Sequence, residues 1–299
     1  MRVIAIFGPT GVGKTDVAVS LAERLRERRE DPVAVSADAL QVYRGLETLT
    51  GAPRPEERER LEHRLVAFLP VTESFSAGEF AQRAHAEIES ALAAGRRPIV
   101  VGGTGLYLQA ALCDLDLRPA PPPELRRRLL RELEARGPAE LHRELARRSP
   151  AAAGGVDPAD RTRVVRALEL LEMGSDPAPT GEESRLWTAS LRHPTLLCGL
   201  VMERAALYGR IDARVDAMVA AGAAEEVRRA DAAGASRTAR QALGFQELLR
   251  GDAEALKRRT RNYAKRQLTW MRKLRGVRVI DLTGRDPAQV AEEAERLLD

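Results

Sequence analysis

The residues best suited to chemistry lie near the start of the chain, between a short apolar run and a helical pattern. Residues 8–15 read GPTGVGKT and fit the P-loop pattern G-x-x-x-x-G-K-[ST]. In such a loop, backbone N–H groups converge on phosphate oxygens at a helix N-terminus, Lys14 adds a positive charge, and Thr15 can hold Mg²⁺. An ordinary glycine turn is the alternative, but the strand, loop and helix setting favours a P-loop. The segment therefore predicts a site for a compound that carries a diphosphate.

A carboxylate is expected beside this loop. A second apolar strand over residues 33–36 runs into Ala37 and Asp38, and the carboxyl ends of parallel strands form the edge where ligands bind. Asp38 could there accept a proton from a nucleophile that attacks the bound diphosphate compound. An aspartate in a surface turn is the alternative. Because no apolar strand ends in a Walker B-like aspartate and the only K-x-D begins inside the P-loop, the sequence does not favour a motor protein or a GTPase.

Other candidate groups give weaker signals. Residues 102–105 read GGTG and follow a third strand at the same edge, which would bring Thr104 to the site. The four histidines show no spacing typical of metal ligands. Cys113 and Cys198 are too few and too scattered for a disulfide framework or a zinc site, and they suit a reducing cytosol.

Positive charge is concentrated near the C-terminus. The formal net charge is +4, yet residues 257–278 contain ten Lys or Arg and no acid, which leaves 38 basic and 44 acidic residues elsewhere. Tyr263 and Trp270 are seven residues apart in this stretch, with Gln267 and Leu274 beside them. One stripe of a helix can therefore pack on the protein while cations project from the rest, as nucleic-acid binding requires. A solvated charged face is the alternative.

The elements that must position these groups alternate as in a parallel α/β sheet. Strands are expected at 2–7, 33–36, 98–101, 196–201 and 277–282, and helices at 16–29 and 80–94. The proline cluster at 119–123 precedes helical stretches at 124–135, 138–148 and 160–173 and a Gly/Ser/Pro linker at 174–181. We therefore predict a P-loop NTPase-like parallel sheet with helices on both faces, formed by 1–116 and 194–299, and an inserted all-helical domain at 117–193.

Length and composition agree with one large or two small folded domains. The 299 residues are 44% hydrophobic and 31% charged, with a mean hydropathy of −0.32, which excludes disordered and fibrous classes. The apolar run at the N-terminus is too short for a signal peptide, and no 18 apolar residues run together. We expect a soluble, cytoplasmic protein that does not bind membranes.

Taken together, the segments resemble a known family, the tRNA dimethylallyltransferases of bacterial type. The matching segments follow the family's order over nearly the whole chain, and nucleotide kinases and GTPases lack the last two. They read GPTGVGKT (8–15), SADALQVYRGL (36–46), FSAGEF (75–80), VGGTGLYL (101–108), DRTRVVRALE (160–169), RQALGFQE (240–247) and TRNYAKRQLTWMR (260–272).

The resemblance implies a prenyl transfer to tRNA. The family moves the five-carbon group of dimethylallyl diphosphate to N6 of adenosine 37, beside the anticodon of tRNAs that read codons beginning with U, and gives N6-isopentenyladenosine. The implied partners are the anticodon stem-loop and dimethylallyl diphosphate, with Mg²⁺ as cofactor and a monomer as the acting form. The target base must leave its stack to reach such a site.

The resemblance also implies roles for individual residues. The catalytic residues would be Asp38, as general base for the adenine N6 amine, with Lys14, Thr15 and Arg240, and Thr15 would also hold the metal. The diphosphate would be bound by Gly8, Thr10, Gly11, Val12, Gly13, Lys14 and Thr15, with Arg240 on the other side. The tRNA would contact the helix at 257–275 and the residues Ser36, Asp38, Ala39, Leu40, Gln41, Thr104, Arg126, Asp160, Arg163, Gly244, Phe245, Arg261, Lys265 and Arg266. Among these, the adenine would be contacted by Ser36, Gln41 and Thr104.

Three positions depart from the family pattern. Ala39 stands where the family usually has Ser, residues 51–53 read GAP where the family has a T-A-K-P segment with its lysine, and Phe245 stands in place of Tyr. No implied catalytic group is removed. The changes bear on one hydrogen bond and one phosphate-directed cation, and hence on kinetics and substrate preference.

Three other functions remain as alternatives. An isopentenyltransferase acting on free adenine nucleotides would share the P-loop and Asp38, but it has little need of the ten-cation segment or the insertion. A small-molecule kinase would consume ATP without prenyl transfer. A non-catalytic RNA-binding protein is disfavoured by the intact Lys14, Thr15 and Asp38.

Overall fold

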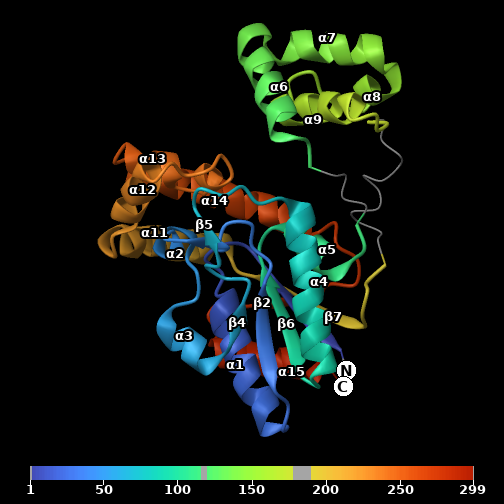
Figure 1. Cartoon of the computed structure of the whole chain (residues 1–299). Coiled ribbons are helices and arrows are strands. Elements are labelled where there is room, and N and C mark those ends of the chain that lie inside the picture. The colour runs from blue at the N-terminus through green and yellow to red at the C-terminus, as the bar shows by residue number, and fades with distance from the viewer. Residues whose placement is uncertain (1, 116–119, 178–189, 299) are drawn as a thin grey trace. The chain divides into compact units, whose positions relative to one another are not determined.

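The chain forms two compact units, one built on a sheet and one built of helices. A computed structural model describes residues 2–115, 120–177 and 190–298 (Figure 1). The first unit comprises Met1–Leu115 with Ala189–Asp299, and the second comprises Asp116–Thr188. The domain boundary expected at 116 and 117 and the end of the expected linker, 178–181, lie outside the described residues.

All six strands of the main sheet are parallel, which confirms the predicted α/β class. Their order is β4-β2-β6-β1-β7-β8, so β1 pairs with β6 on one side and β7 on the other. Every residue of β1 and β2 is buried, because helices cover both faces of such a sheet. The strands are β1 Val3–Phe7, β2 Pro32–Ser36, β4 His63–Arg64, β6 Arg97–Gly102, β7 Thr195–Val201 and β8 Arg278–Asp281.

Helices pack on both faces of the sheet (Figure 1). On one face, α1 Lys14–Glu27 and α15 Pro287–Arg296 contact each other and share a core with Ile4, Ile6 and Ile99. The crossover from β4 through α4 to β6 runs opposite to the one from β1 through α1 to β2, so right-handed connections place α4 on the other face. That face carries α4 Ala77–Ala93 and α5 Gly105–Leu112.

The remaining elements of the first unit are shorter connections and a group of late helices. A two-stranded parallel sheet pairs β3 Tyr43–Arg44 with β5 Leu69–Pro70. The helices are α2 Glu47–Thr50, α3 Pro55–Arg60, α11 Arg204–Ala220, α12 Ala223–Ala232, the 3-10 turn η1 Ala239–Gln241, α13 Phe245–Leu249 and α14 Ala253–Met271. Helix α14 packs against α11, α13 and α5.

The second unit, taken by itself, has its own apolar core. Leucines of three helices meet there, including Leu129, Leu133, Leu141, Leu145 and Leu168. Its helices are α6 Pro123–Arg136, α7 Pro138–Arg148, α8 Pro150–Gly154 and α9 Arg161–Glu172. Across the described ranges of both units, no helix has the length and apolar character needed to span a bilayer.

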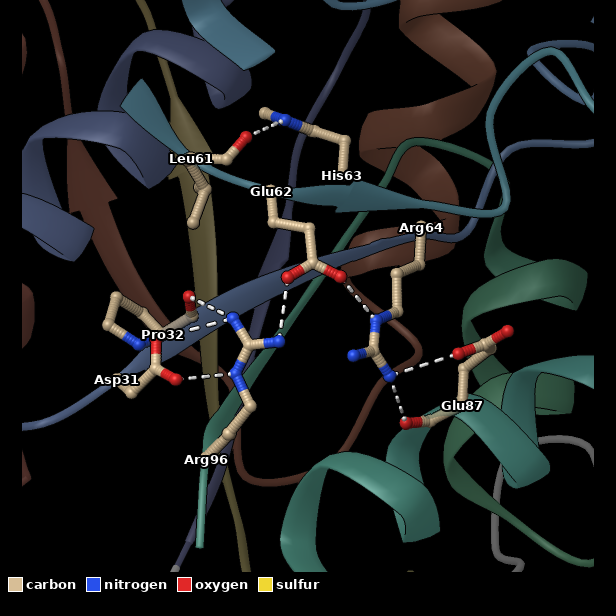
Figure 2. Close-up of polar contacts among 8 residues, drawn as sticks. All are labelled: Asp31, Pro32, Leu61, Glu62, His63, Arg64, Glu87 and Arg96. Atoms are coloured by element: carbon tan, nitrogen blue, oxygen red, sulfur yellow. Dashed lines mark hydrogen bonds and ion pairs between the residues drawn. The ribbon is translucent and has the colours of Figure 1, made fainter. Parts of the chain in front are cut away.

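Ion pairs hold the edge strand β4, which is only two residues long. Arg96 pairs with Asp31 (2.7 Å) and Glu62 (2.6 Å), and Arg64 pairs with Glu62 (2.8 Å) and with Glu87 of α4 (3.0 Å), as Figure 2 shows. Hydrogen bonds from Arg64 and Arg96 lower the pKa of Glu62. Because Asp31 and Arg96 directly precede β2 and β6, this network lies at the edge of the sheet opposite to the P-loop.

A buried carboxylate joins α12 to the segment that follows β3. Glu226 is 8% exposed and accepts hydrogen bonds from the backbone N–H groups of Thr48 (3.0 Å) and Leu49 (2.9 Å), at the start of α2. A carboxylate is a strong acceptor for such N-terminal amides. Glu226 therefore fixes α2, and with it the loop that returns toward the P-loop.

We expect Glu226→Ala to lower the free energy of unfolding by about 2–3 kcal/mol, because the backbone amides of Thr48 and Leu49 lose a buried, charged acceptor. Urea unfolding followed by circular dichroism measures the loss. The matched control is Glu225→Ala, whose exposed carboxylate pairs with Arg228 and should cost less than about 1 kcal/mol. Equal losses in the two variants would contradict the capping role.

Candidate active site

The P-loop joins the central strand β1 to α1 with a backbone that suits phosphate. Gly11 and Gly13 have φ values of 81° and 104°, a region that favours glycine. A side chain at Gly8 would meet the Val12 side chain at 2.9 Å and the Leu200 carbonyl at 3.0 Å. Because α1 begins directly after Gly13, its unpaired N–H groups and the positive end of its dipole lie at the loop.

Lys14 is the cation inside the loop. Its Nζ donates to the carbonyl oxygens of Gly8 (3.0 Å) and Pro9 (3.1 Å). Burial lowers the pKa of Lys14 to about 8, the positive charge of Arg214 adds to the lowering, and the negative charge of Asp38 opposes it. Lys14 thus lies within electrostatic range of both Arg214 and Asp38.

Asp38 follows β2 at the carboxyl edge, in a half-buried segment that also contains Ala39 and Leu40. One carboxylate oxygen of Asp38 accepts the N–H of Leu40 at 2.9 Å, a turn that fixes the side chain. Ser36 donates to Gln41 Oε1 (2.9 Å), and Gln41 Nε2 donates to the Gly51 carbonyl (3.1 Å). Three of the residues implied at the adenine and the base therefore sit in one short hydrogen-bonded loop.

Two arginines of α11 lie at this site although no motif marks them. Burial lowers the pKa of Arg214, while the negative charge of Asp38 leads the opposing effects. Arg214 also donates to the Gly51 carbonyl at 3.5 Å, and Arg210 lies 3.9 Å from Asp16 of α1. The sequence feature that could have indicated Arg210 and Arg214 is their i, i+4 spacing on the helix that follows β7, the strand beside β1.

The recorded contacts of Arg240, the arginine implied at the diphosphate, lie elsewhere. Its guanidinium pairs with Asp231, its Nε donates to the Ala235 carbonyl (2.9 Å), and it lies 5.6 Å from the ring centre of the fully buried Phe245. Gly244, with a φ of 100°, directly precedes α13. In the described structure Arg240 thus connects η1 with α12 and α13, and the arginines near the P-loop are Arg210, whose Nη2 would lie 3.2 Å from a Cβ on Gly13, and Arg214.

The glycine turn after β6 packs against α14. Thr104 Oγ1 lies 2.9 Å from Tyr263 Oη, and a side chain at Gly105 would meet the Trp270 ring at 1.9 Å. Burial raises the pKa of Tyr263 to about 12, and the charge of Asp38 adds to the rise. The stripe that carries Tyr263 and Trp270 therefore packs at the site, in agreement with their spacing in the sequence.

The cations of α14 do not all project into solvent. Arg261 donates to both carboxylate oxygens of Asp212 on α11, at 2.8 and 2.7 Å. Lys265 and Arg266 are exposed. Lys265 and Arg266 thus project from the helix as expected, whereas Arg261 pairs with Asp212 and connects α14 to α11.

The helical unit contains the other residues implied at RNA. Glu169 is fully buried and pairs with Arg126 (3.1 Å) and Arg166 (3.2 Å). Asp160 caps α9 by accepting the N–H groups of Thr162 and Arg163. Arg126 and Asp160 therefore have structural partners within this unit, and the side chain of Arg163 is more exposed than either.

Sequence comparisons define the family. A profile of IPP transferases matches residues 41–274. The tRNA dimethylallyltransferase of Symbiobacterium thermophilum is 41% identical over 100% of this chain and 95% of its own length. That of Anaeromyxobacter dehalogenans is 42% identical over 99% of this chain and 100% of its own.

Comparison with solved structures indicates the same family. The tRNA isopentenylpyrophosphate transferase of Bacillus halodurans is 33% identical with a TM-score of 0.66, covering 99% of each chain. A eukaryotic dimethylallyltransferase acting on tRNA is 28% identical with a TM-score of 0.79, covering 99% of this chain and 77% of its own. The parallel sheet and its glycine loop define a P-loop α/β enzyme. The chain belongs to the IPP transferase family and, within it, to the tRNA dimethylallyltransferases, which are prenyltransferases.

The lowered pKa of Lys14 predicts a pH-dependent affinity for diphosphate. In the free protein Lys14 loses its proton as the pH rises through about 8, whereas a bound diphosphate favours the charged ammonium. Binding should therefore take up protons above this pH, and the affinity should fall as the pH rises further. For the same reason, the free protein should gain stability as the pH rises above about 8, because the unfolded chain still holds the proton that the folded chain has released.

Calorimetry with inorganic pyrophosphate, in buffers of different ionisation enthalpy, measures this proton uptake. Lys14→Met should abolish it and weaken binding. The control is Lys257→Met, which removes a lysine that pairs with Asp216 on α11. Proton uptake that persists in Lys14→Met would contradict the assignment.

Proposed function

We propose that this chain transfers the dimethylallyl group of dimethylallyl diphosphate to N6 of adenosine 37 in tRNA, beside the anticodon. The observation that carries the proposal is the P-loop around Lys14, whose pKa is affected by the charges of Arg214 and of Asp38, a carboxylate that can act as a base. Transferases that modify free adenine nucleotides and small-molecule kinases have little use for the exposed cations of α14.

The donor half of the site binds and stabilises the diphosphate. Backbone N–H groups of the P-loop and Lys14 would bind its oxygens, and Arg214, which lies within electrostatic range of Lys14, would add a second positive charge. As the bond from C1 to oxygen breaks, negative charge grows on the leaving diphosphate, and these fixed positive groups stabilise it. In this proposal Arg214 takes the place that the family resemblance implies for Arg240.

Mg²⁺ fits the donor half through Thr15, whose half-buried hydroxyl follows Lys14 in the first turn of α1. Within the described ranges no group of three or more His, Cys, Asp or Glu is arranged to hold a metal ion. This suits an ion that keeps several waters and takes its other ligands from substrate phosphates. When bound, the ion would neutralise charge on the leaving diphosphate.

The acceptor half of the site activates the adenine. The N6 amine is a poor nucleophile because its lone pair is delocalised into the ring, so proton removal must accompany formation of the N–C bond. Asp38 accepts that proton, and its turn with Leu40 leaves the rest of the carboxylate available. Ser36, Gln41 and Thr104 would contact the base, which leaves its stack to enter.

Asp38→Asn tests the base. The variant keeps the shape of the side chain but cannot accept the proton, so kcat should fall by about 10²–10⁴ while the Kd for tRNA changes little. Turnover of labelled donor with an anticodon stem-loop measures kcat, and a gel shift measures the Kd. Asp31→Asn, at the opposite edge of the sheet, is the control. Normal turnover with lost RNA binding would make Asp38 a recognition residue.

Salt dependence tests the RNA surface. Each phosphate contact that is lost should reduce the log–log slope of affinity against salt by about one. We expect Lys265→Ala and Arg266→Ala to reduce the slope in this way, because both side chains are exposed. Arg261→Ala should change the slope less, because Arg261 already pairs with Asp212. Slopes that fall most in Arg261→Ala would move the RNA contact elsewhere on α14.

A further inference from the structure

One buried side chain of α14 touches both glycine loops of the site. Gln267 is 4% exposed. Its Oε1 accepts the N–H of Thr10 in the P-loop at 2.8 Å, and its Nε2 donates to the Gly103 carbonyl at 2.7 Å. Both ends of the carboxamide are therefore used, and their order is fixed, because a flipped amide would set donor against donor and acceptor against acceptor.

The atoms around this contact are closely packed. A Cβ atom on Gly103 would lie 2.4 Å from Gln267 Nε2, 3.1 Å from the Gly8 carbonyl oxygen and 3.3 Å from Lys14 Nζ. The P-loop, the turn after β6 and α14 thus meet at one point beside the half-buried Lys14. Because close-packed interiors transmit displacements, a shift of α14 changes the position of the Thr10 amide or breaks its hydrogen bond.

The same turn of α14 carries the cations that RNA can reach. Lys265 and Arg266 directly precede Gln267 and are exposed. Tyr263, one turn earlier, holds Thr104 through its hydroxyl. Since a helix is stiff over one turn, RNA bound to Lys265 and Arg266 acts on the buried stripe that holds the two glycine loops.

We propose that Gln267 is a positioning residue that couples tRNA docking on α14 to the geometry of the diphosphate loop. The inference rests on the proposed function, because it requires RNA on α14 and a diphosphate in the P-loop. Docked RNA steadies the hydrogen bonds that Gln267 already makes with Thr10 and Gly103, and the diphosphate then binds more tightly. By linkage, the diphosphate raises the affinity for RNA by the same factor.

The test compares the wild type, Gln267→Met and the control Gln82→Met. Methionine keeps the length of glutamine without its amide, and Gln82 is an exposed glutamine of α4. Calorimetry measures the affinity for inorganic pyrophosphate with Mg²⁺, with and without an anticodon stem-loop RNA. RNA should raise this affinity at least about fivefold in the wild type and in Gln82→Met. In Gln267→Met the factor should fall toward one, while the affinity for RNA alone stays unchanged.

A second variant, Gln267→Glu, tests the same inference if Gln267→Met folds poorly. Gln267→Glu retains the acceptor for Thr10 and loses the donor to Gly103. The factor by which RNA raises its affinity for pyrophosphate should therefore lie between those of the wild type and Gln267→Met. In turnover assays, both variants should raise the KM for the prenyl donor at saturating tRNA. A mere loss of folded protein would lower the apparent kcat without this change in KM.

The outcomes separate the inference from the proposed function. Coupling in both Gln267 variants equal to that of the wild type, or no coupling in the wild type, would overturn the inference. A wild-type protein that couples RNA to pyrophosphate but transfers no prenyl group would contradict the proposed function and leave the role of Gln267 standing.

Discussion

The tight turn from β1 into α1 is the constraint on which the rest of the site depends. A phosphate loop needs the end of a strand, the start of a helix and bare backbone, and position 8 must be glycine because a Cβ there would meet Val12 at 2.9 Å and the Leu200 carbonyl of β7 at 3.0 Å. Because β1 lies between β6 and β7 in a parallel sheet, the segments that follow β2, β6 and β7 all begin at the carboxyl edge, where the P-loop lies. Asp38, Thr104 and α11 are therefore brought to the loop by the order of strands.

The positive charges of Lys14 in the P-loop and Arg214 on α11 repel each other. Lys14 is half-buried, desolvation lowers the pKa of both Lys14 and Arg214, and the positive charge of Arg214 adds to the lowering at Lys14. The arrangement is unfavourable until a strong anion lies between them, which makes the same groups effective in binding and in stabilising charge on a leaving diphosphate. Asp38 opposes the lowering for both cations, so the base also contributes to the donor site.

The sequence predicts the parts of this structure that depend on local pattern. The continuous apolar runs that became β1, β2, β6, β7 and β8 are long enough to be recognised, whereas β3, β4 and β5 have two residues each and exist only through their partners. The P-loop, Asp38 and the stripe of α14 follow from spacing. Arg214 and the pairs of Arg240 with Asp231 and Arg261 with Asp212 do not, because their partners are distant in sequence or set by tertiary packing.

Helix α14 explains why the basic segment contains no acid and yet can pack beside a cationic site. Its buried stripe of Tyr263, Gln267 and Trp270 must reach two glycine loops near Lys14, where additional positive charge is costly. Acids on the neighbouring helix α11 reduce that cost, since Asp212 pairs with Arg261 and Asp216 pairs with Lys257. An acid beside the exposed Lys265 and Arg266 would instead compete with RNA phosphates for these cations. The pairing of Asp212 and Asp216 on α11 with cations of α14 thus lets α14 contact the glycine loops on one face and RNA on the other.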